Sequence, residues 1–122
     1  MHPSKQIILG IDPGTKVTGY GLILSDGISM ELLAIGCIQT EKFDDHYDRL
    51  HCIYDRILEI ILAYKPSILA IEAPFFGKNV QSMLKLGRAQ GMAIAAALSQ
   101  KIPIQEYSPI KVKQSVPGIG NA

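Results

Sequence analysis

One stretch decides the fold of this chain, Gln6-Ile7-Ile8-Leu9-Gly10-Ile11-Asp12-Pro13-Gly14-Thr15. Residues 6–11 are almost continuously apolar and rich in β-branched side chains, which is typical of a central strand covered on both faces. The Pro-Gly pair after Asp12 favours a tight turn. The stretch therefore predicts a buried strand that ends at an acidic residue.

Two more strands are predicted directly after this turn, over residues 17–24 and 30–38. Between them, Ser25-Asp26-Gly27 has the composition of a hairpin connection. The first part of the chain is therefore expected to form an antiparallel meander of three strands.

The rest of the chain alternates helices and strands. A helix is predicted from about Asp45 or His46 that stops before Pro66, with one apolar face made by Leu50, Ile53, Tyr54, Ile57, Ile61 and Tyr64. A short apolar strand follows over 68–71, and because a helical crossover reaches it, it should run parallel to a strand of the meander. The later elements are predicted as a helix over 79–100 capped by Asn79, a strand over 103–107 and a short helix over 109–116.

This order, βββ-α-β-α-β-α, indicates an α/β fold in which helices flank a five-stranded mixed sheet. The length of 122 residues suits a single domain spanning residues 1–122. Residues 117–122 have loop composition, and Asn121 is placed to cap a helix that does not follow. We therefore expect a domain truncated at its carboxyl end.

Composition excludes several classes of protein. Apolar residues make up 48% of the chain and charged residues 19%, which excludes disordered and collagen-like sequences. The longest apolar stretch, Gly91–Leu98, is too short for a membrane span, and the first residues lack the pattern of a secretory signal. Cys37 and Cys52 have no metal-ligand spacing and are expected to be reduced and packed like small hydrophobes. The sequence predicts a cytoplasmic protein with no membrane association.

Charge is distributed unevenly along the chain. Residues 1–74 contain six basic and ten acidic residues, a net charge of −4, whereas residues 75–122 contain six basic residues and one acidic, a net charge of +5. This asymmetry indicates that one surface of the protein binds a polyanion.

Two acidic residues stand where predicted strands end, Asp12 after the first strand and Glu72 after the strand over 68–71. Neighbouring parallel strands lie about 4.8 Å apart, so carboxylates at their carboxyl ends can share one cation. Such a pair suits Mg²⁺ or Mn²⁺, which prefer oxygen ligands. Each residue also has a simpler interpretation: Asp12 as the start of a Pro-Gly turn, and Glu72 as a solvated residue that leaves a strand.

The apolar runs before these two residues favour the metal interpretation. Both carboxylates should emerge at the edge of a core, where an acid is partly desolvated and needs a partner. No basic residue lies within three positions of Glu72, and only Lys16 follows Asp12 closely. A metal ion would therefore be the natural partner of both charges.

Several short motifs occur in a fixed order along nearly the whole chain, Ile8–Gly14, Thr18–Gly21, Ala70–Glu72, Lys78-Asn79, Leu84–Gly87, Ala89–Gly91, Val112–Gln114 and Gly118–Gly120. Together they resemble the RuvC family of bacterial Holliday junction resolvases. The resemblance implies a ribonuclease H-like fold, a homodimer, and metal-dependent, symmetric endonuclease action on four-way DNA junctions in recombination and repair. It also implies the branch-migration helicase complex of RuvA and RuvB as a partner.

The resemblance assigns roles to individual residues. It implies that Asp12 and Glu72 are catalytic metal ligands and that Lys113 lies near the active site and stabilises the scissile phosphate. The family's remaining acidic ligands are expected on a helix just after Ala122. Two Mg²⁺ ions are expected in the complete enzyme, with Mn²⁺ as a plausible substitute. The chain of 122 residues is expected to bind junctions without cleaving them, because two carboxylates do not easily hold two divalent ions.

Further residues are candidates for DNA contact. The resemblance implies that Phe75 stacks on bases at the junction, although it could equally be ordinary core. Lys78, Lys85, Arg88 and Lys111 are expected to bind phosphates, although Lys111, like Lys101, could instead belong to a solvated charged face. His46 and His51 have no ligand partner at a useful spacing and are given no role.

The predicted second helix is unusually rich in small residues, which serve either packing on the sheet or contact between helices across a two-fold axis. Two other functions remain open. An ATP-handling domain of the sugar-kinase type would use Asp12-Pro13-Gly14-Thr15 as a phosphate loop, but it needs two such domains, and 122 residues cannot supply both. The other is a junction-binding module without nuclease activity.

Overall fold

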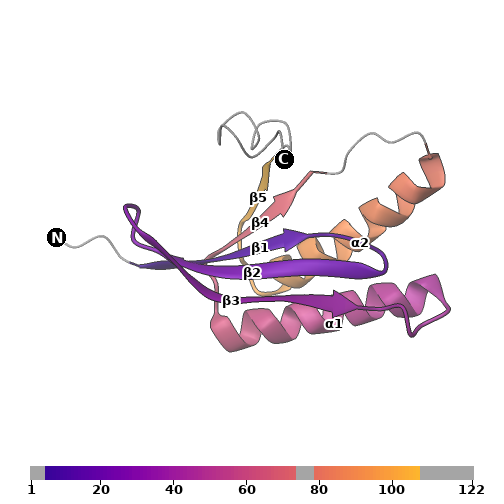
Figure 1. Ribbon diagram of the computed structural model, residues 1–122, viewed down its shortest axis with the longest axis horizontal. Coiled ribbons are helices and arrows are strands. Elements are labelled where there is room, and N and C mark those ends of the chain that lie inside the picture. The colour runs from indigo at the N-terminus through magenta and orange to yellow at the C-terminus, as the bar shows by residue number, and fades with distance from the viewer. Residues whose placement is uncertain (1–4, 74–78, 108–122) are drawn as a thin grey trace.

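Five strands form one mixed sheet in the order β3-β2-β1-β4-β5 (Figure 1). The structure is a computed structural model that describes residues 5–73 and 79–107. Its elements are β1 (Gln6–Asp12), β2 (Val17–Ser25), β3 (Met30–Gln39), α1 (His46–Tyr64), β4 (Ile68–Glu72), α2 (Val80–Ser99) and β5 (Ile104–Tyr107).

The connections follow the predicted order. β1 pairs with β2, and β2 with β3, in antiparallel fashion, whereas β4 runs parallel to both β1 and β5. The prediction of a five-stranded mixed sheet with a parallel strand after the first helix is confirmed. The helix predicted over 109–116 lies outside the described residues.

Both helices pack on the same face of the sheet. Alternate residues of β1 and β4, such as Leu9, Ile11, Leu69 and Ile71, are buried in one cluster with apolar side chains of α1 and α2. Residues between them in sequence, such as Gly10, point to the opposite face, because side chains alternate along a strand. Among the described elements, no helix covers that opposite face (Figure 1), which we call the open face.

The ends of the helices are set by local chemistry. The Asp45 side chain caps α1 by accepting a hydrogen bond from the backbone N–H of Asp48, and Lys65 closes the helix in the left-handed region with φ of 51°. Asn79 caps α2 through the N–H of Ser82, as predicted. In α1, Ile60 joins the core, whereas Tyr64, which the spacing placed on the core face, is exposed.

The packing predicted for the cysteines is only partly correct. Cys52 is half-buried on α1, but Cys37 is exposed. The reason is that Cys37 lies on edge strand β3 and alternates with Ile38, whose side chain takes the core position. No helix in the described residues combines the length and the apolar character that a membrane span requires.

Candidate functional site at the carboxyl ends of β1 and β4

The register of the sheet places Asp12 beside Glu72. Ile11 is paired with Ile71 in the parallel β1–β4 ladder, and both are core residues, so the next residues, Asp12 and Glu72, project together from the open face. The two carboxylates come from neighbouring strands about 4.8 Å apart. The predicted convergence of the two acids is thus supported by the strand register.

Tyr107 completes this corner of the sheet. It is paired with Glu72 in the β4–β5 ladder and lines, together with Asp12, a shallow cavity of about 360 Å³ on the open face. Burial raises the pKa of the Tyr107 hydroxyl above its ordinary value, and the nearby carboxylates of Glu72 and Asp12 raise it further. Both acids therefore act on the same phenol, which stays protonated at neutral pH.

The expectation that both acids are partly desolvated is correct for Glu72 and wrong for Asp12. Glu72 is half-buried, but Asp12 is exposed. The neighbour of Asp12 on β2 is Gly19, and a Cβ added there would lie 3.7 Å from the Asp12 Cβ. Because Gly19 has no side chain, it adds no apolar group beside the exposed carboxylate, which suits a hard cation that keeps part of its hydration shell.

The loop between β1 and β2 is held rigidly next to these acids. Gly14 donates its N–H to the Thr18 hydroxyl at 3.2 Å, and that hydroxyl donates to the Gly14 carbonyl at 2.8 Å. The buried Thr40 hydroxyl donates to the Thr15 carbonyl, and the Thr40 N–H donates to the Lys16 carbonyl. A Cβ on Gly14 would lie 2.1 Å from the Val17 carbonyl oxygen, so this loop requires glycine there.

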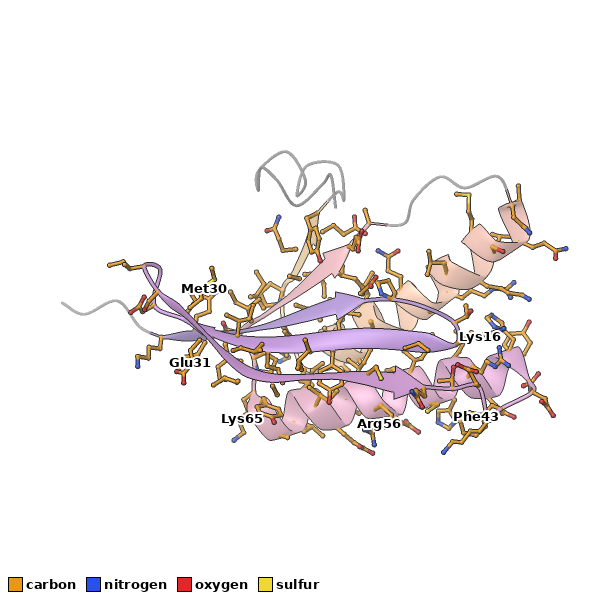
Figure 2. The ribbon with its side chains drawn as sticks, in the orientation of Figure 1. Lys16, Met30, Glu31, Phe43, Arg56 and Lys65 are labelled. Atoms are coloured by element: carbon orange, nitrogen blue, oxygen red, sulfur yellow. The ribbon has the colours of Figure 1, made fainter. Side chains whose placement is uncertain are left out.

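The same loop borders a second cavity, of about 520 Å³. We call it the basic pocket, and its lining residues are Gly14, Thr15, Lys16, Asp44, His46, Arg49, Ser82, Lys85 and Leu86. It lies where α1 and α2 begin, on the side of the molecule that also carries the β1–β2 loop (Figure 1). Figure 2 shows Lys16 at this end of the molecule, whereas Arg56 lies further along α1.

Two of the predicted DNA-contact residues, Lys85 and Arg88, lie in the described part of α2 and are exposed. The structure places them toward the start of α1, with Lys85 in the basic pocket and the Arg88 guanidinium 6.0 Å from the centre of the Tyr47 ring. Phe75, Lys78, Lys111 and Lys113 lie outside the described residues, and their roles stay predictions.

Several residues near the site were missed by the sequence analysis. The side chain of Gln90, only 6% exposed, donates hydrogen bonds to the Glu72 carbonyl at 3.3 Å and to Glu106 Oε1 at 3.1 Å. It thereby ties α2 to the ends of β4 and β5. Gln90 belongs to the motif Ala89–Gly91, but nothing in the sequence pattern indicates this contact or the place of Tyr107 next to the acids.

His46 gives the folding stability a pH dependence that can be measured. Burial lowers the pKa of His46 below its ordinary value of 6.5, and the positive charges of Arg88, Lys85 and Arg49 lower it further. Below pH 6.5 the unfolded chain therefore binds more protons than the folded one, so this contribution is complete above pH 6.5 and is lost as the pH falls toward the lowered value.

We expect a His46→Gln variant to show a shallower loss of unfolding free energy between pH 6.5 and pH 5, by less than one proton in the linkage slope. Urea unfolding in phosphate-free buffer measures this. His51→Gln, an exposed histidine on the same helix, is the matched control. An identical slope in wild type and His46→Gln would contradict the prediction.

Comparison with known proteins agrees with this geometry. A family described as "Crossover junction endodeoxyribonuclease RuvC" matches residues 8–122. Proteins of that description from Porphyromonas gingivalis and Bacteroides fragilis are 57% and 58% identical over 122 and 123 residues, which cover all of this chain and 65% of each relative. The structure of T. thermophilus RuvC in complex with a Holliday junction substrate superposes with a TM-score of 0.84, at 27% identity, over 93% of this chain and 71% of that one.

The fold and the site define an α/β domain of the ribonuclease H-like type with an acidic site at the carboxyl ends of two parallel strands. The chain belongs to the RuvC family. It spans about 65% of the length of the curated relatives described above.

Proposed function

We propose that this chain is the nuclease domain of a structure-selective endonuclease that resolves Holliday junctions by symmetric, metal-dependent hydrolysis of phosphodiester bonds. The observation that carries the proposal is the projection of Asp12 and Glu72 from adjacent parallel strands in a chain of the RuvC family. The solved relative in complex with a Holliday junction supports four-way junction DNA as the substrate.

Mg²⁺ is the cofactor we propose, with Mn²⁺ as a substitute, and Asp12 and Glu72 are the residues that would hold it. Two carboxylates, one of them exposed and paired with a residue that has no side chain, fit a hard, partly hydrated cation. When bound, such ions supply charge stabilisation for both the attacking water and the leaving 3′ oxygen. Within residues 5–73 and 79–107, no three His, Cys, Asp or Glu side chains gather to hold one ion, so we propose that further ligands and the second ion depend on residues beyond this range.

The chain's own residues position the substrate around this site. The rigid β1–β2 loop keeps Asp12 in place, and Gln90 fixes the end of β4 that carries Glu72. Tyr107, protonated at neutral pH, forms one wall of the cavity beside Asp12 and adds no negative charge that would repel a phosphate. We propose in addition that Lys113 stabilises the scissile phosphate and that Phe75 stacks on bases at the junction.

We also propose that the protein acts as a homodimer that associates through α2. Its alanines Ala89, Ala93, Ala96 and Ala97 are buried in the core and account for the packing role of the small residues. A separate stripe on the same helix faces outward: Val80, Leu84 and Leu98 are 68%, 57% and 58% exposed, and a Cβ on Gly87 or Gly91 would meet nothing within 4 Å. Their positions, 80, 84, 87, 91 and 98, follow one face of a helix.

A charge in this stripe should separate the subunits. We expect Leu84→Glu to weaken dimerisation at least about 30-fold, because it buries a carboxylate at the centre of an apolar contact. Sedimentation velocity at several concentrations measures the change. Leu62→Glu, at a leucine of α1 that is 54% exposed, is the control. A Leu84→Glu protein that remains dimeric would rule out this helix face.

The proposed activity is tested on a synthetic four-way junction and on a linear duplex of the same sequence. A chain with the full length of the relatives should nick the junction in the presence of Mg²⁺ and leave the duplex intact, whereas residues 1–122 alone should bind the junction without cleaving it. Binding without cleavage by the longer chain would support a junction-binding module instead. From family membership we also propose that RuvA and RuvB are branch-migration partners of this protein. We propose a cytoplasmic location on the same basis.

A further inference from the structure

The basic pocket contains more positive charge than it can neutralise. Lys16, Arg49 and Lys85 line it, and Asp44 is the one acidic side chain among its lining residues. Among the described residues, none of these four takes part in an ion pair. The charges come from three separate segments, the β1–β2 loop and the beginnings of α1 and α2, which are far apart in sequence. Their convergence is a property of the fold.

One residue of the pocket lining, His46, has a polar ring atom without a partner among the described residues. His46 Nε2 is shielded from solvent and makes no hydrogen bond to any described residue. A buried polar atom left unpaired costs free energy, so a ligand that can share a hydrogen bond with it is favoured. An oxygen of a phosphate group can accept a hydrogen bond from the imidazole, and it also attracts the three cations. The positive charges that lower the pKa of His46 would also attract an anion to the pocket.

The walls of the pocket are already in place. The Arg49 Nε donates a hydrogen bond to the Phe43 carbonyl at 2.6 Å, which leaves the terminal nitrogens of its guanidinium available. The Gly14, Thr15 and Lys16 carbonyls are occupied by hydrogen bonds from Thr18 and Thr40. Both helices also begin here, and helix amino-terminal ends favour negative charge. Arg49 and the β1–β2 loop therefore need little reorganisation to receive an anion.

We propose that the basic pocket, through Lys16, His46, Arg49 and Lys85, holds one phosphodiester group of the DNA strand beside the scissile phosphate. The inference rests on the proposed function, and it adds a specific contact that positions the strand. Gly14 is two residues from Asp12, so its Cα lies at most about 7.6 Å from that of Asp12. The loop wall of the pocket is consequently close to Asp12, whose carboxylate projects from the other face of the sheet.

The test is a binding scan with neutral phosphate substitutions. A set of four-way junctions is prepared, each with a single methylphosphonate at a different position near the crossover. A chain of the relatives' full length is titrated against each junction. EDTA is present throughout, so that binding is measured without cleavage. We expect one position to weaken binding by wild type about tenfold, because a charge-assisted contact is lost there. In Arg49→Met the same methylphosphonate should weaken binding less than about twofold, because the contact is already absent.

Two further variants distinguish a specific phosphate contact from a general effect of positive charge. Lys16→Met, at an exposed loop residue, repeats the test in case Arg49→Met affects folding. Arg56→Met removes an arginine two turns further along α1, outside the pocket, and should retain the full tenfold effect. If the methylphosphonate effect is equally large in Arg49→Met, Lys16→Met and wild type, the pocket does not hold that phosphate and the inference is wrong.

Two further outcomes are distinguishable. If inorganic phosphate alone shifts the His46 imidazole resonances while no methylphosphonate effect depends on Arg49 or Lys16, the pocket binds a free anion and the inference is overturned although the proposed function stands. If wild type neither binds nor cleaves the junction, the proposed function itself fails, and this inference fails with it.

Discussion

Replacing Glu72 by glutamine should abolish junction cleavage by a chain of the relatives' full length and leave junction binding intact. The amide has the shape of the carboxylate but lacks its charge, so a divalent ion shared with Asp12 loses a ligand. Metal-assisted charge stabilisation contributes several kcal/mol to such reactions, which corresponds to a loss of at least about 1,000-fold in single-turnover rate. Asp12→Asn should behave in the same way.

The matched control for this experiment is Glu106→Gln. Glu106 is paired with Ile71 one residue before Glu72 in the β4–β5 ladder, and its side chain contacts Gln90 on the helix face. An amide at position 106 can still accept that hydrogen bond, so cleavage should remain within about threefold of wild type. If Glu72→Gln loses binding or melts at a much lower temperature, Glu72 is structural and the acidic site is misassigned.

Replacing Lys85 and Arg88 together by methionine should make junction binding less dependent on salt. Each lysine or arginine that neutralises a phosphate contributes about 0.9 to the slope of log affinity against log salt concentration, so the double variant should lose about 1.8. Between 50 and 200 mM salt, wild-type affinity should therefore fall about twelvefold more than that of the variant. Fluorescence anisotropy over a salt series measures both slopes.

The control has to remove the same charge from another surface. Lys42 and Arg56 both line a small cavity between β3 and α1 and do not line the basic pocket. The double variant Lys42→Met and Arg56→Met changes the net charge equally and should keep the wild-type slope. Equal slopes in all three proteins would remove Lys85 and Arg88 from the DNA interface, whatever the effect on affinity at one salt concentration.

The fold could be predicted because its signals are local. The apolar run before Asp12, the hairpin composition at Ser25-Asp26-Gly27 and the capping residue Asn79 each act over a few residues, and the structure contains the corresponding strand, turn and helix. The parallel placement of β4 followed from the need to cross back over the sheet by a helix. The prediction was less accurate where burial depends on distant elements: Tyr64, Cys37 and Asp12 are all exposed.

Part of the candidate site could also be predicted from local signals. The convergence of Asp12 and Glu72 follows from strand ends and register, which a sequence pattern can indicate. Gln90, Tyr107 and His46 gave no such signal. The importance of Gln90 and Tyr107 comes from partners 16 or more residues away, and that of His46 from a ring nitrogen with no partner in the described part of the chain, beside a pocket that three segments form. Ligand spacing along the chain gives His46 no role, because it does not detect a residue whose surroundings form only on folding.

By itself, the sequence determined the strands and helices, their order, and the position of two carboxylates at strand ends, because backbone preference and hydrophobic periodicity are encoded in neighbouring residues. The tertiary structure decided which face of the sheet α1 and α2 cover, that the outward stripe of α2 is separate from its buried alanines, and that Lys16, Arg49 and Lys85 surround one cavity. Burial and electrostatic fields are sums over residues that meet only after folding, so no local pattern could specify them.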